Sequence, residues 1–246
     1  VLGVFGESGN TNLGVERIPY SWGGELSYFQ TKTVNKAKSS QSLNPIRVRS
    51  NQLNMLGDGL DPDVKPKVYT TAKGITALLV SDITMLESAF SFGVGCGYYQ
   101  DPEDIPGLAH LMEHVIFLGS KENPDPIAWD EFLLKKGGAS NAYTSGDSTV
   151  FYVLSSPAEL ESVALYFTKM LTNPVIDESS SVSEIDAVNQ EHEKNIPNKV
   201  RVMVELALHL APKSCPATKF GTGSTETLRI NTEKKNISLK KALSEY

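Results

Sequence analysis

Three ionisable side chains interrupt an otherwise apolar stretch of the sequence, GLAHLMEHVIFLG at residues 107–119. At about 100° per residue, His110, Glu113 and His114 fall within one arc of a helix, and apolar residues cover the remaining circumference. The helix is therefore predicted to be buried together with its three polar groups. Buried imidazoles and carboxylates are costly unless they are compensated, and a divalent metal compensates two imidazoles and a carboxylate together.

The order of these residues, H-x-x-E-H, is the inverted form of a zinc-binding motif. Two histidines one helical turn apart, His110 and His114, can both reach one zinc ion. Glu113 beside them can act as a general base on water held at the zinc. A lone core histidine is more often bonded to a carbonyl than to a metal, but the combined pattern is specific and favours zinc.

A catalytic zinc usually has three protein ligands, so one more carboxylate or histidine is needed. In SVSEIDAVNQEHEKN, residues 181–195, Glu191 and Glu184 share a helical arc with apolar residues, and the opposite arc carries Asp186, Asn189, Glu193 and Lys194. We therefore expect Glu191 to point inward. Of the other two histidines, His192 diverges from Glu191 by about 100° and is not expected to share its ion, and His209 is predicted to be a core histidine.

The composition, with 40% apolar and 21% charged residues among 246, is that of a globular protein. A formal charge of −6 and a pI near 5.3 argue against a nucleic-acid surface and suit a cationic peptide partner better. No apolar run approaches the roughly 18 residues of a membrane span. The two cysteines, Cys96 and Cys215, are predicted to be free thiols rather than one bridge, which leaves the compartment undetermined.

The segments around the motif predict an α+β layer architecture with a mainly antiparallel sheet. Strands are expected within residues 67–82 and 88–99, and a strand pair within 139–156. Helices are expected at 128–136, after Ser156, at 180–195 and at 199–211, with Ser156 and Glu159 at capping-box spacing. In SAFSFGVGCGYY, residues 88–99, bulky side chains alternate with small ones, and a helix is expected to pack on the small face.

Four stretches, GLAHLMEHVIFLGS, GGASNAYTSGDST, EIDAVNQEHEKN and KFGTGSTETL, resemble the amino-terminal domain of the insulin-degrading enzyme and pitrilysin family of inverted zinc metallopeptidases. The resemblance extends from about residue 68 to the end of the chain. It implies one zinc ion per chain, with ligands at His110, His114 and Glu191. It further implies that Glu113 activates water and that Glu184 supports the site.

The resemblance also implies a mode of substrate binding and a set of partners. A peptide would add as a strand to an edge formed by Ser140, Asn141, Ala142 and Tyr143. Family members are several times longer and have later domains that enclose the substrate. We therefore expect a fragment that is weakly active or inactive alone and prone to self-association. Residues 1–45 are predicted to be a polar, partly irregular extension, and 46–246 a zinc-binding peptidase domain truncated at its C-terminus.

The implied function is that of a zinc metalloendopeptidase acting on short to medium peptides. One alternative is a processing peptidase that trims targeting sequences, since that branch shares the zinc motif. Another is a non-catalytic peptide-binding scaffold. The EHEKN and KFGTG segments resemble the insulin-degrading branch and favour the first reading, and the complete motif argues against the scaffold.

Overall fold

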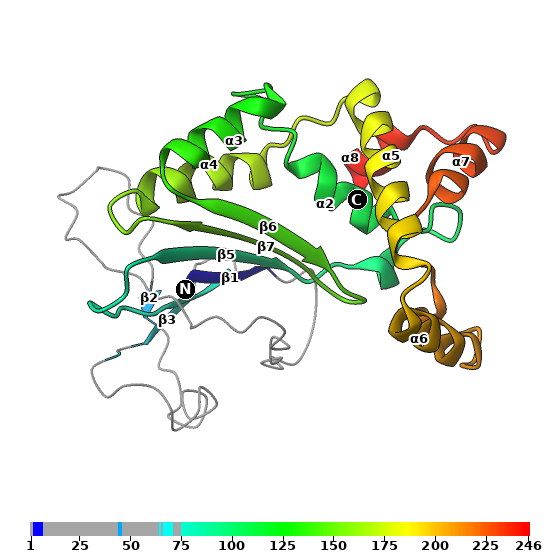
Figure 1. Cartoon of the computed structure of the whole chain (residues 1–246), viewed down its shortest axis with the longest axis horizontal. Coiled ribbons are helices and arrows are strands. Elements are labelled where there is room, and N and C mark those ends of the chain that lie inside the picture. Colours follow the sequence, from blue (N-terminus) through cyan, green and yellow to red (C-terminus); the bar gives the residue numbers. More distant parts are fainter. Residues whose placement is uncertain (1, 7–43, 46–63, 65, 71–74) are drawn as a thin grey trace.

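The computed structural model describes residues 2–6, 44–45, 64, 66–70 and 75–246, which form one sheet and a set of helices (Figure 1). The strands are β1 (Leu2–Gly6), β2 (Asn44–Pro45), β3 (Lys67–Thr70), β4 (Thr76–Leu79), β5 (Ser88–Val94), β6 (Ala139–Thr144) and β7 (Thr149–Ser155). The α-helices are α2 (Leu108–Ile116), α3 (Pro126–Lys135), α4 (Leu160–Thr172), α5 (Glu178–Asn195), α6 (Lys199–His209), α7 (Asn231–Lys234) and α8 (Leu239–Glu245). Shorter turns are η2 (Tyr98–Gln100), η3 (Pro216–Thr218) and the π-helical η4 (Glu226–Ile230). The predicted α+β class is confirmed.

The sheet has the strand order β2-β3-β4-β1-β5-β7-β6. Its neighbouring strands are antiparallel except for β1 and β5, which are parallel. The predicted strand pairs are confirmed, as β3 with β4 and as β6 with β7. Because β6 pairs only with β7 among the described strands, it forms an edge of the sheet.

The first strand lies within residues 1–45, which the sequence predicts to be an extension. β1 pairs with β4 on one side and with β5 on the other, so Leu2–Gly6 contribute to the sheet itself. Residues 7–43 lie outside the described part of the chain. The domain boundary at residue 45 therefore stays a prediction. The composition of residues 1–45 did not indicate that β1 would belong to the sheet.

One hydrophobic core lies between the sheet and the helices α3 and α4, which cover the same face (Figure 1). Phe90 of β5 meets Phe167 of α4 edge to face at 6.2 Å, and Trp129 of α3 stacks on Phe167 at 5.2 Å. The expectation that a helix would pack on the small face of residues 88–99 is therefore wrong. Aromatic side chains bury more apolar area than glycines can, so the bulky face attracts the helices.

The helix α4 begins at Leu160, later than the capping-box pattern predicted. Glu159 is the N-cap residue and makes no side-chain cap bond, whereas the Ser156 carbonyl accepts a hydrogen bond from Glu159 N at 3.0 Å. The Ser156-Pro segment thus forms a turn, and the predicted capping box is wrong. The predicted helix itself is present, and its Val163 and Phe167 are fully buried.

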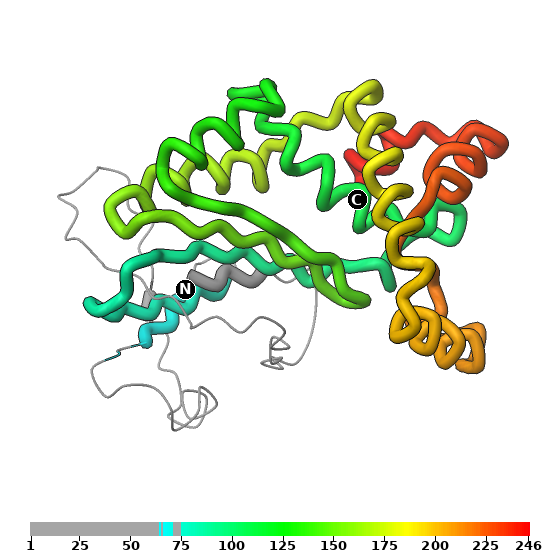
Figure 2. The backbone as a smooth tube through the Cα atoms, in the orientation of Figure 1, coloured from blue at the N-terminus to red at the C-terminus, as the bar shows by residue number. Residues whose placement is uncertain are grey.

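A second core joins segments that are distant in sequence. α2 packs against α5, and buried residues of α2, α5, η4 and α8 form one cluster. Figure 2 shows the chain beyond residue 220 returning to lie beside α2 and α5. This second core holds the motif helix in place from the side opposite to the sheet.

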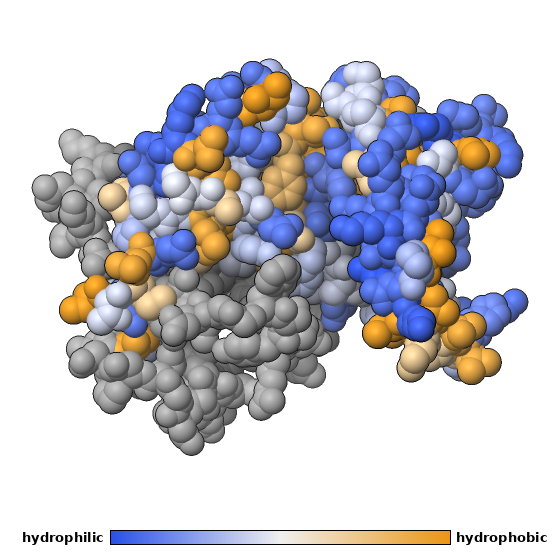
Figure 3. All heavy atoms as spheres, viewed as in Figure 1, coloured by the Kyte–Doolittle hydropathy of each residue, from blue (hydrophilic) through white to orange (hydrophobic). Residues whose placement is uncertain are grey.

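The helix α6 is exposed although it is apolar. Val200, Met203, Leu206 and Leu210 keep 61% to 86% of their surface in contact with solvent, and Figure 3 shows apolar side chains gathered over this helix at the lower right. His209 is exposed as well, so its prediction as a core histidine is wrong. The apolar pattern identified the helix correctly, but nothing in the described part of the chain covers it.

Two compositional expectations can be compared with the structure. Cys96 and Cys215 are both free, as predicted. Among the described helices, none combines the length and the hydropathy needed to cross a membrane.

The packing of α4 leads to a stability prediction. Phe167→Ala removes a fully buried ring in contact with Phe90 and Trp129, and should lower the free energy of unfolding by about 3–5 kcal/mol. Leu165→Ala, on the same helix but 60% exposed, serves as the matched control and should change it by less than about 0.5 kcal/mol. Urea unfolding of both variants measures the difference, and similar losses would contradict this core.

Candidate metal centre

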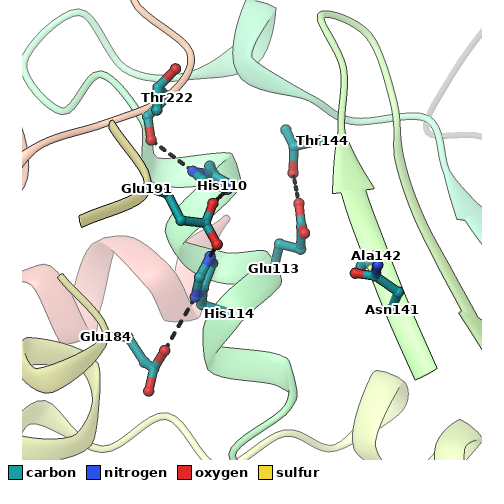
Figure 4. A network of polar contacts seen from close by, with 9 residues as sticks. All are labelled: His110, Glu113, His114, Asn141, Ala142, Thr144, Glu184, Glu191 and Thr222. Carbon is teal, nitrogen blue, oxygen red and sulfur yellow. Dashed lines mark hydrogen bonds and ion pairs between the residues drawn. The ribbon is translucent and has the colours of Figure 1, made fainter. Parts of the chain in front are cut away.

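The helix α2 carries the three motif side chains on one face and is buried on its others. Leu111 and Val115 are fully buried, which sets the rotation of the helix about its axis. His110, Glu113 and His114 consequently face α5 and β6 (Figure 4). Glu113 is buried at 8% exposure, whereas the histidine side chains keep 15% and 16%.

The start of α2 is fixed by a buried carboxylate. Gly107 precedes the helix with a left-handed φ of 93°. Asp101 accepts hydrogen bonds from Gly107 N at 2.7 Å and from Ala109 N at 2.9 Å. Burial raises the pKa of Asp101, and the hydrogen bonds from these amides oppose that rise. The first turn of α2 is thereby anchored directly before His110.

Glu191 reaches the motif from α5. Its Oε2 lies 3.5 Å from His110 Nε2, and its Oε1 lies 3.8 Å from His114 Nε2. One ligand atom from each of the three residues lies within 4.8 Å of the others. Ligand atoms about 2.1 Å from one tetrahedral zinc are about 3.4 Å apart, so this donor set fits a single ion with small adjustments.

Each histidine has a partner at its second nitrogen. His110 Nδ1 lies 2.7 Å from the carbonyl oxygen of Thr222, and His114 Nδ1 lies 3.2 Å from Glu184 Oε2. Because a carbonyl oxygen can only accept, His110 Nδ1 carries the proton, and Nε2 faces Glu191. A carbonyl or carboxylate partner at the distal nitrogen is typical of metal-binding histidines.

Glu113 has a different environment from the other carboxylates. Burial raises its pKa, while a hydrogen bond donated by Thr144 Oγ1 to Glu113 Oε2 and the two nearby imidazoles lower it. Thr144 is the last residue of β6, so the carboxylate of Glu113 is held against the edge strand of the sheet. Figure 4 shows Glu113 turned towards Thr144 and away from Glu191.

Glu191 and His110 face each other, and each shifts the pKa of the other. The hydrogen bond with His110 lowers the pKa of Glu191. Burial lowers the pKa of His110, but the hydrogen bonds to Glu191 and Thr222 and the nearby carboxylates outweigh it and raise the pKa. In the metal-free chain, each of the two side chains therefore favours the charged form of the other.

The site opens into a groove of about 540 Å³. Its lining includes Asn141–Thr144 of β6, the side chains of His110, Glu113 and Glu191, and the segment around Thr222. Val200, Val204 and Leu208 of α6 add apolar side chains to the same groove. The candidate ligands therefore lie beside an open strand edge in a space that is large enough for several residues of a peptide.

The four predicted substrate-binding residues lie on β6, but their side chains face different ways. Ser140 Oγ accepts a hydrogen bond from the Trp129 indole at 3.1 Å, so its hydroxyl contacts the core. Asn141 and Tyr143 point to the opposite face of the sheet. Asn141 Oδ1 also accepts from Ala142 N at 2.8 Å. Asn141 and Tyr143 are exposed, whereas Ser140 and Ala142 are partly buried.

Two contacts of the site were absent from the sequence predictions. Thr144 directly follows the predicted edge-strand residues, and its position at the end of that strand is the one signal in the sequence that could have pointed to its contact with Glu113. The Thr222 carbonyl is a backbone group, which has no signature in residue type. His192 is not part of the cluster of His110, His114 and Glu191, and it meets the Phe220 ring edge to face at 5.1 Å.

Residues 76–213 match the sequence profile of insulinase, peptidase family M16, and this range contains His110, Glu113, His114 and Glu191. The chain belongs to the insulinase family. Members of this family are peptidases, and the predicted relationship is confirmed.

Individual insulinase-family proteins support the assignment. Insulin-degrading enzyme of Mus musculus is 36% identical over 175 residues, which cover 71% of this chain and 17% of that protein. The A-factor-processing enzyme of Saccharomyces cerevisiae is 32% identical over 206 residues, or 82% of this chain and 20% of that protein. The crystal structure of pitrilysin superimposes with a TM-score of 0.74 and 25% identity, covering 84% of this chain and 21% of that one. The chain thus spans about a fifth of the length of these relatives.

The burial of Glu113 predicts how the stability of the metal-free chain depends on pH. Because the folded pKa is raised above the ordinary value of 4.5, the folded state holds the Glu113 proton more tightly than the unfolded state does. The contribution of Glu113 to stability therefore falls as pH rises from that value through the raised pKa. Glu113→Gln removes this dependence, so the variant should gain stability relative to the wild type across that window.

Thermal unfolding of the chelator-treated proteins between about pH 4 and pH 8 tests this sign. Glu161→Gln, an exposed residue of α4, is the control and should show no such trend. A difference between wild type and Glu113→Gln that stays constant with pH would contradict the raised pKa.

Proposed function

We propose that this chain is the zinc-binding part of a metalloendopeptidase that hydrolyses short to medium peptides with water activated by Glu113. The observation that carries the proposal is the convergence of His110 Nε2, His114 Nε2 and the Glu191 carboxylate. Glu113 comes from the same helix as the histidines but is turned towards the edge strand. The chain thus separates three candidate ligands from one candidate base.

The nature of the donors favours zinc. Two imidazoles and one carboxylate form a mixed nitrogen and oxygen set that suits Zn²⁺, and three protein ligands leave a fourth position open, as in catalytic sites. A bound zinc would polarise a peptide carbonyl and lower the pKa of water. We assign His110, His114 and Glu191 as the ligands and Glu184 as the partner that orients the His114 ring.

We assign Glu113 as the general base. Its Oε2 is held by the Thr144 hydroxyl, so Oε1 is the atom that takes a proton from the attacking water and later delivers it to the departing amine. Burial raises the pKa of Glu113 towards the range in which a carboxylate both accepts and returns a proton efficiently. Thr144 limits that rise and keeps the carboxylate oriented.

We propose that a peptide adds to β6 as a further strand, through the backbone of Ser140, Asn141, Ala142 and Tyr143. Asn141 Oδ1 would leave the Ala142 amide as the peptide arrives, because both compete for the same donor. Backbone pairing places little demand on side chains, and the apolar wall from Val200, Val204 and Leu208 would favour an apolar residue. The related enzymes are named for insulin and for A-factor, which supports peptide substrates.

We further propose that this chain works together with the remaining domains of a longer enzyme. Its relatives are about five times as long, and the exposed apolar side chains of α6 support a covering partner. In isolation the chain should be weakly active or inactive and should self-associate through such surfaces. The sequence-predicted domain of residues 46–246 remains our proposed boundary, with β1 contributing a strand to it.

The assigned ligands predict the metal content. The purified chain should bind about one zinc, and His110→Ala, His114→Ala and Glu191→Gln should each weaken binding by more than about a hundredfold, since even outer partners account for 10–100-fold. Glu178→Gln removes an exposed acid at the other end of α5 and should leave affinity unchanged. Competition with a chromophoric chelator measures this. Unchanged affinity in both His110→Ala and Glu191→Gln would refute the assigned ligands.

The separation of base from ligands predicts a second pattern. In the full-length enzyme, Glu113→Gln should retain zinc but lose turnover by about 10²–10⁴-fold, because an amide cannot accept the proton. Glu161→Gln, which lies on α4 away from the groove, should behave as the wild type does. Metal analysis and a fluorogenic peptide assay provide the two readouts. Substantial cleavage by the Glu113→Gln enzyme would show that another group serves as the base.

A further inference from the structure

The KFGTGST segment, Lys219–Thr225, lies across the start of α2 and is bonded along its length. At its beginning, Lys219 Nζ donates to the carbonyl oxygens of Tyr99 at 2.9 Å and of Asp101 at 2.6 Å. Gly221 lies against the ring of Tyr98 so closely that a Cβ there would be 2.4 Å from two ring carbons. These contacts join the segment to the loop whose Asp101 also anchors the first turn of α2.

At the centre of the segment, backbone atoms of Thr222 and Gly223 contact the start of α2. Gly107 and Gly223 both have left-handed φ angles, of 93° and 77°. A Cβ on Gly107 would lie 2.2 Å from the Gly223 Cα, and a Cβ on Gly223 would lie 2.8 Å from Leu228 Cδ1. Only glycines allow this approach and these angles together. The approach places the carbonyl of Thr222 2.7 Å from His110 Nδ1.

The end of the segment is tied to the other helix of the site. Thr225 N donates to Asn189 Oδ1 at 2.9 Å. Asn189 lies on α5, two residues before Glu191. Within the described structure, one short segment therefore contacts both the helix that carries the two histidines and the helix that carries the carboxylate.

We propose that Lys219–Thr225 is the positioning element of the metal site, which orients His110 and sets the spacing between His110 and Glu191. This inference rests on the proposed zinc function. The Thr222 carbonyl selects the His110 tautomer with the proton on Nδ1 and leaves Nε2 directed at the ion. A backbone carbonyl is only as rigid as the segment that bears it. The contacts of Lys219, Gly223 and Thr225 with neighbouring elements fix this segment and therefore the position of the Thr222 carbonyl.

Gly223→Ala is the most direct test, because a Cβ there would lie 2.8 Å from Leu228 Cδ1 and 3.2 Å from Gly107 Cα, so the segment would have to shift. The variant should bind zinc about 10–100-fold more weakly, the range known for partners of metal-binding histidines. Gly137→Ala is the matched control, since Gly137 also has a left-handed φ, of 62°, but a Cβ there meets nothing within 4 Å. It imposes the same kind of backbone strain without touching the site and should bind zinc as the wild type does.

Asn189→Ala is a milder second variant, which removes the acceptor of Thr225 N from a half-buried position. It should weaken zinc binding by about tenfold, which is the lower end of the same range. If Gly223→Ala does not fold, Asn189→Ala alone tests the positioning role of the segment. Thermal unfolding of the metal-free proteins identifies folded variants. Zinc affinity is measured by chelator competition on the whole chain.

Two spectroscopic readouts separate positioning from general destabilisation. The visible absorption of the Co²⁺-loaded chain reports coordination geometry, and should change in Gly223→Ala and Asn189→Ala but not in Gly137→Ala. Imidazole ¹⁵N spectra of the zinc-loaded wild type should show His110 protonated at Nδ1. Equal affinity and identical Co²⁺ spectra in both variants would overturn the positioning role alone, whereas a wild type that binds no zinc would overturn the zinc proposal and this inference with it.

Discussion

Two imidazoles and a carboxylate lie on the one face of α2 that is not covered by apolar side chains, and their need for polar partners shapes the surrounding structure. Each imidazole has two nitrogens, so a single neighbour cannot satisfy it. Glu191 faces the Nε2 atoms of His110 and His114, and Glu184 and the Thr222 carbonyl contact the Nδ1 atoms. α5 must therefore pack along α2 for two turns, and the chain beyond residue 220 must return to the start of the helix.

The same helix connects this centre to the sheet. Glu113 points away from Glu191 and bonds to Thr144, the final residue of the edge strand β6. Thr149, which pairs with Thr144, is buried and donates to the Cys96 carbonyl at 2.9 Å, so the end of the strand pair is itself held. A peptide aligned on β6 would consequently be aligned with respect to Glu113, because strand and carboxylate share one hydrogen bond.

In the metal-free chain, Glu191 and His110 shift each other's pKa. Glu191 is half exposed and has a lowered pKa, while the pKa of His110 is raised, because each side chain favours the charged form of the other. A divalent cation would bind both groups in their deprotonated forms, so its affinity would depend on pH. The affinity of a metal for this position would also depend on the orientation of the His110 ring, which directs Nε2 towards Glu191.

The sequence alone determined what depends on local periodicity. The 3.6-residue repeat placed His110, Glu113 and His114 on one face of a buried helix and Glu184 and Glu191 on one arc of another, and alternation identified the strand pair β6 and β7. Tertiary structure decided what depends on contacts between distant segments. Thr144 faces Glu113 only because of the register of β6, and Thr222 acts through a carbonyl that every residue type possesses. The apolar pattern of α6 could not indicate that the helix is uncovered and that His209 is exposed, because a pattern shows which face is apolar and not what lies against it. For the same reason the sequence of Leu2–Gly6 could not indicate that β1 enters the sheet.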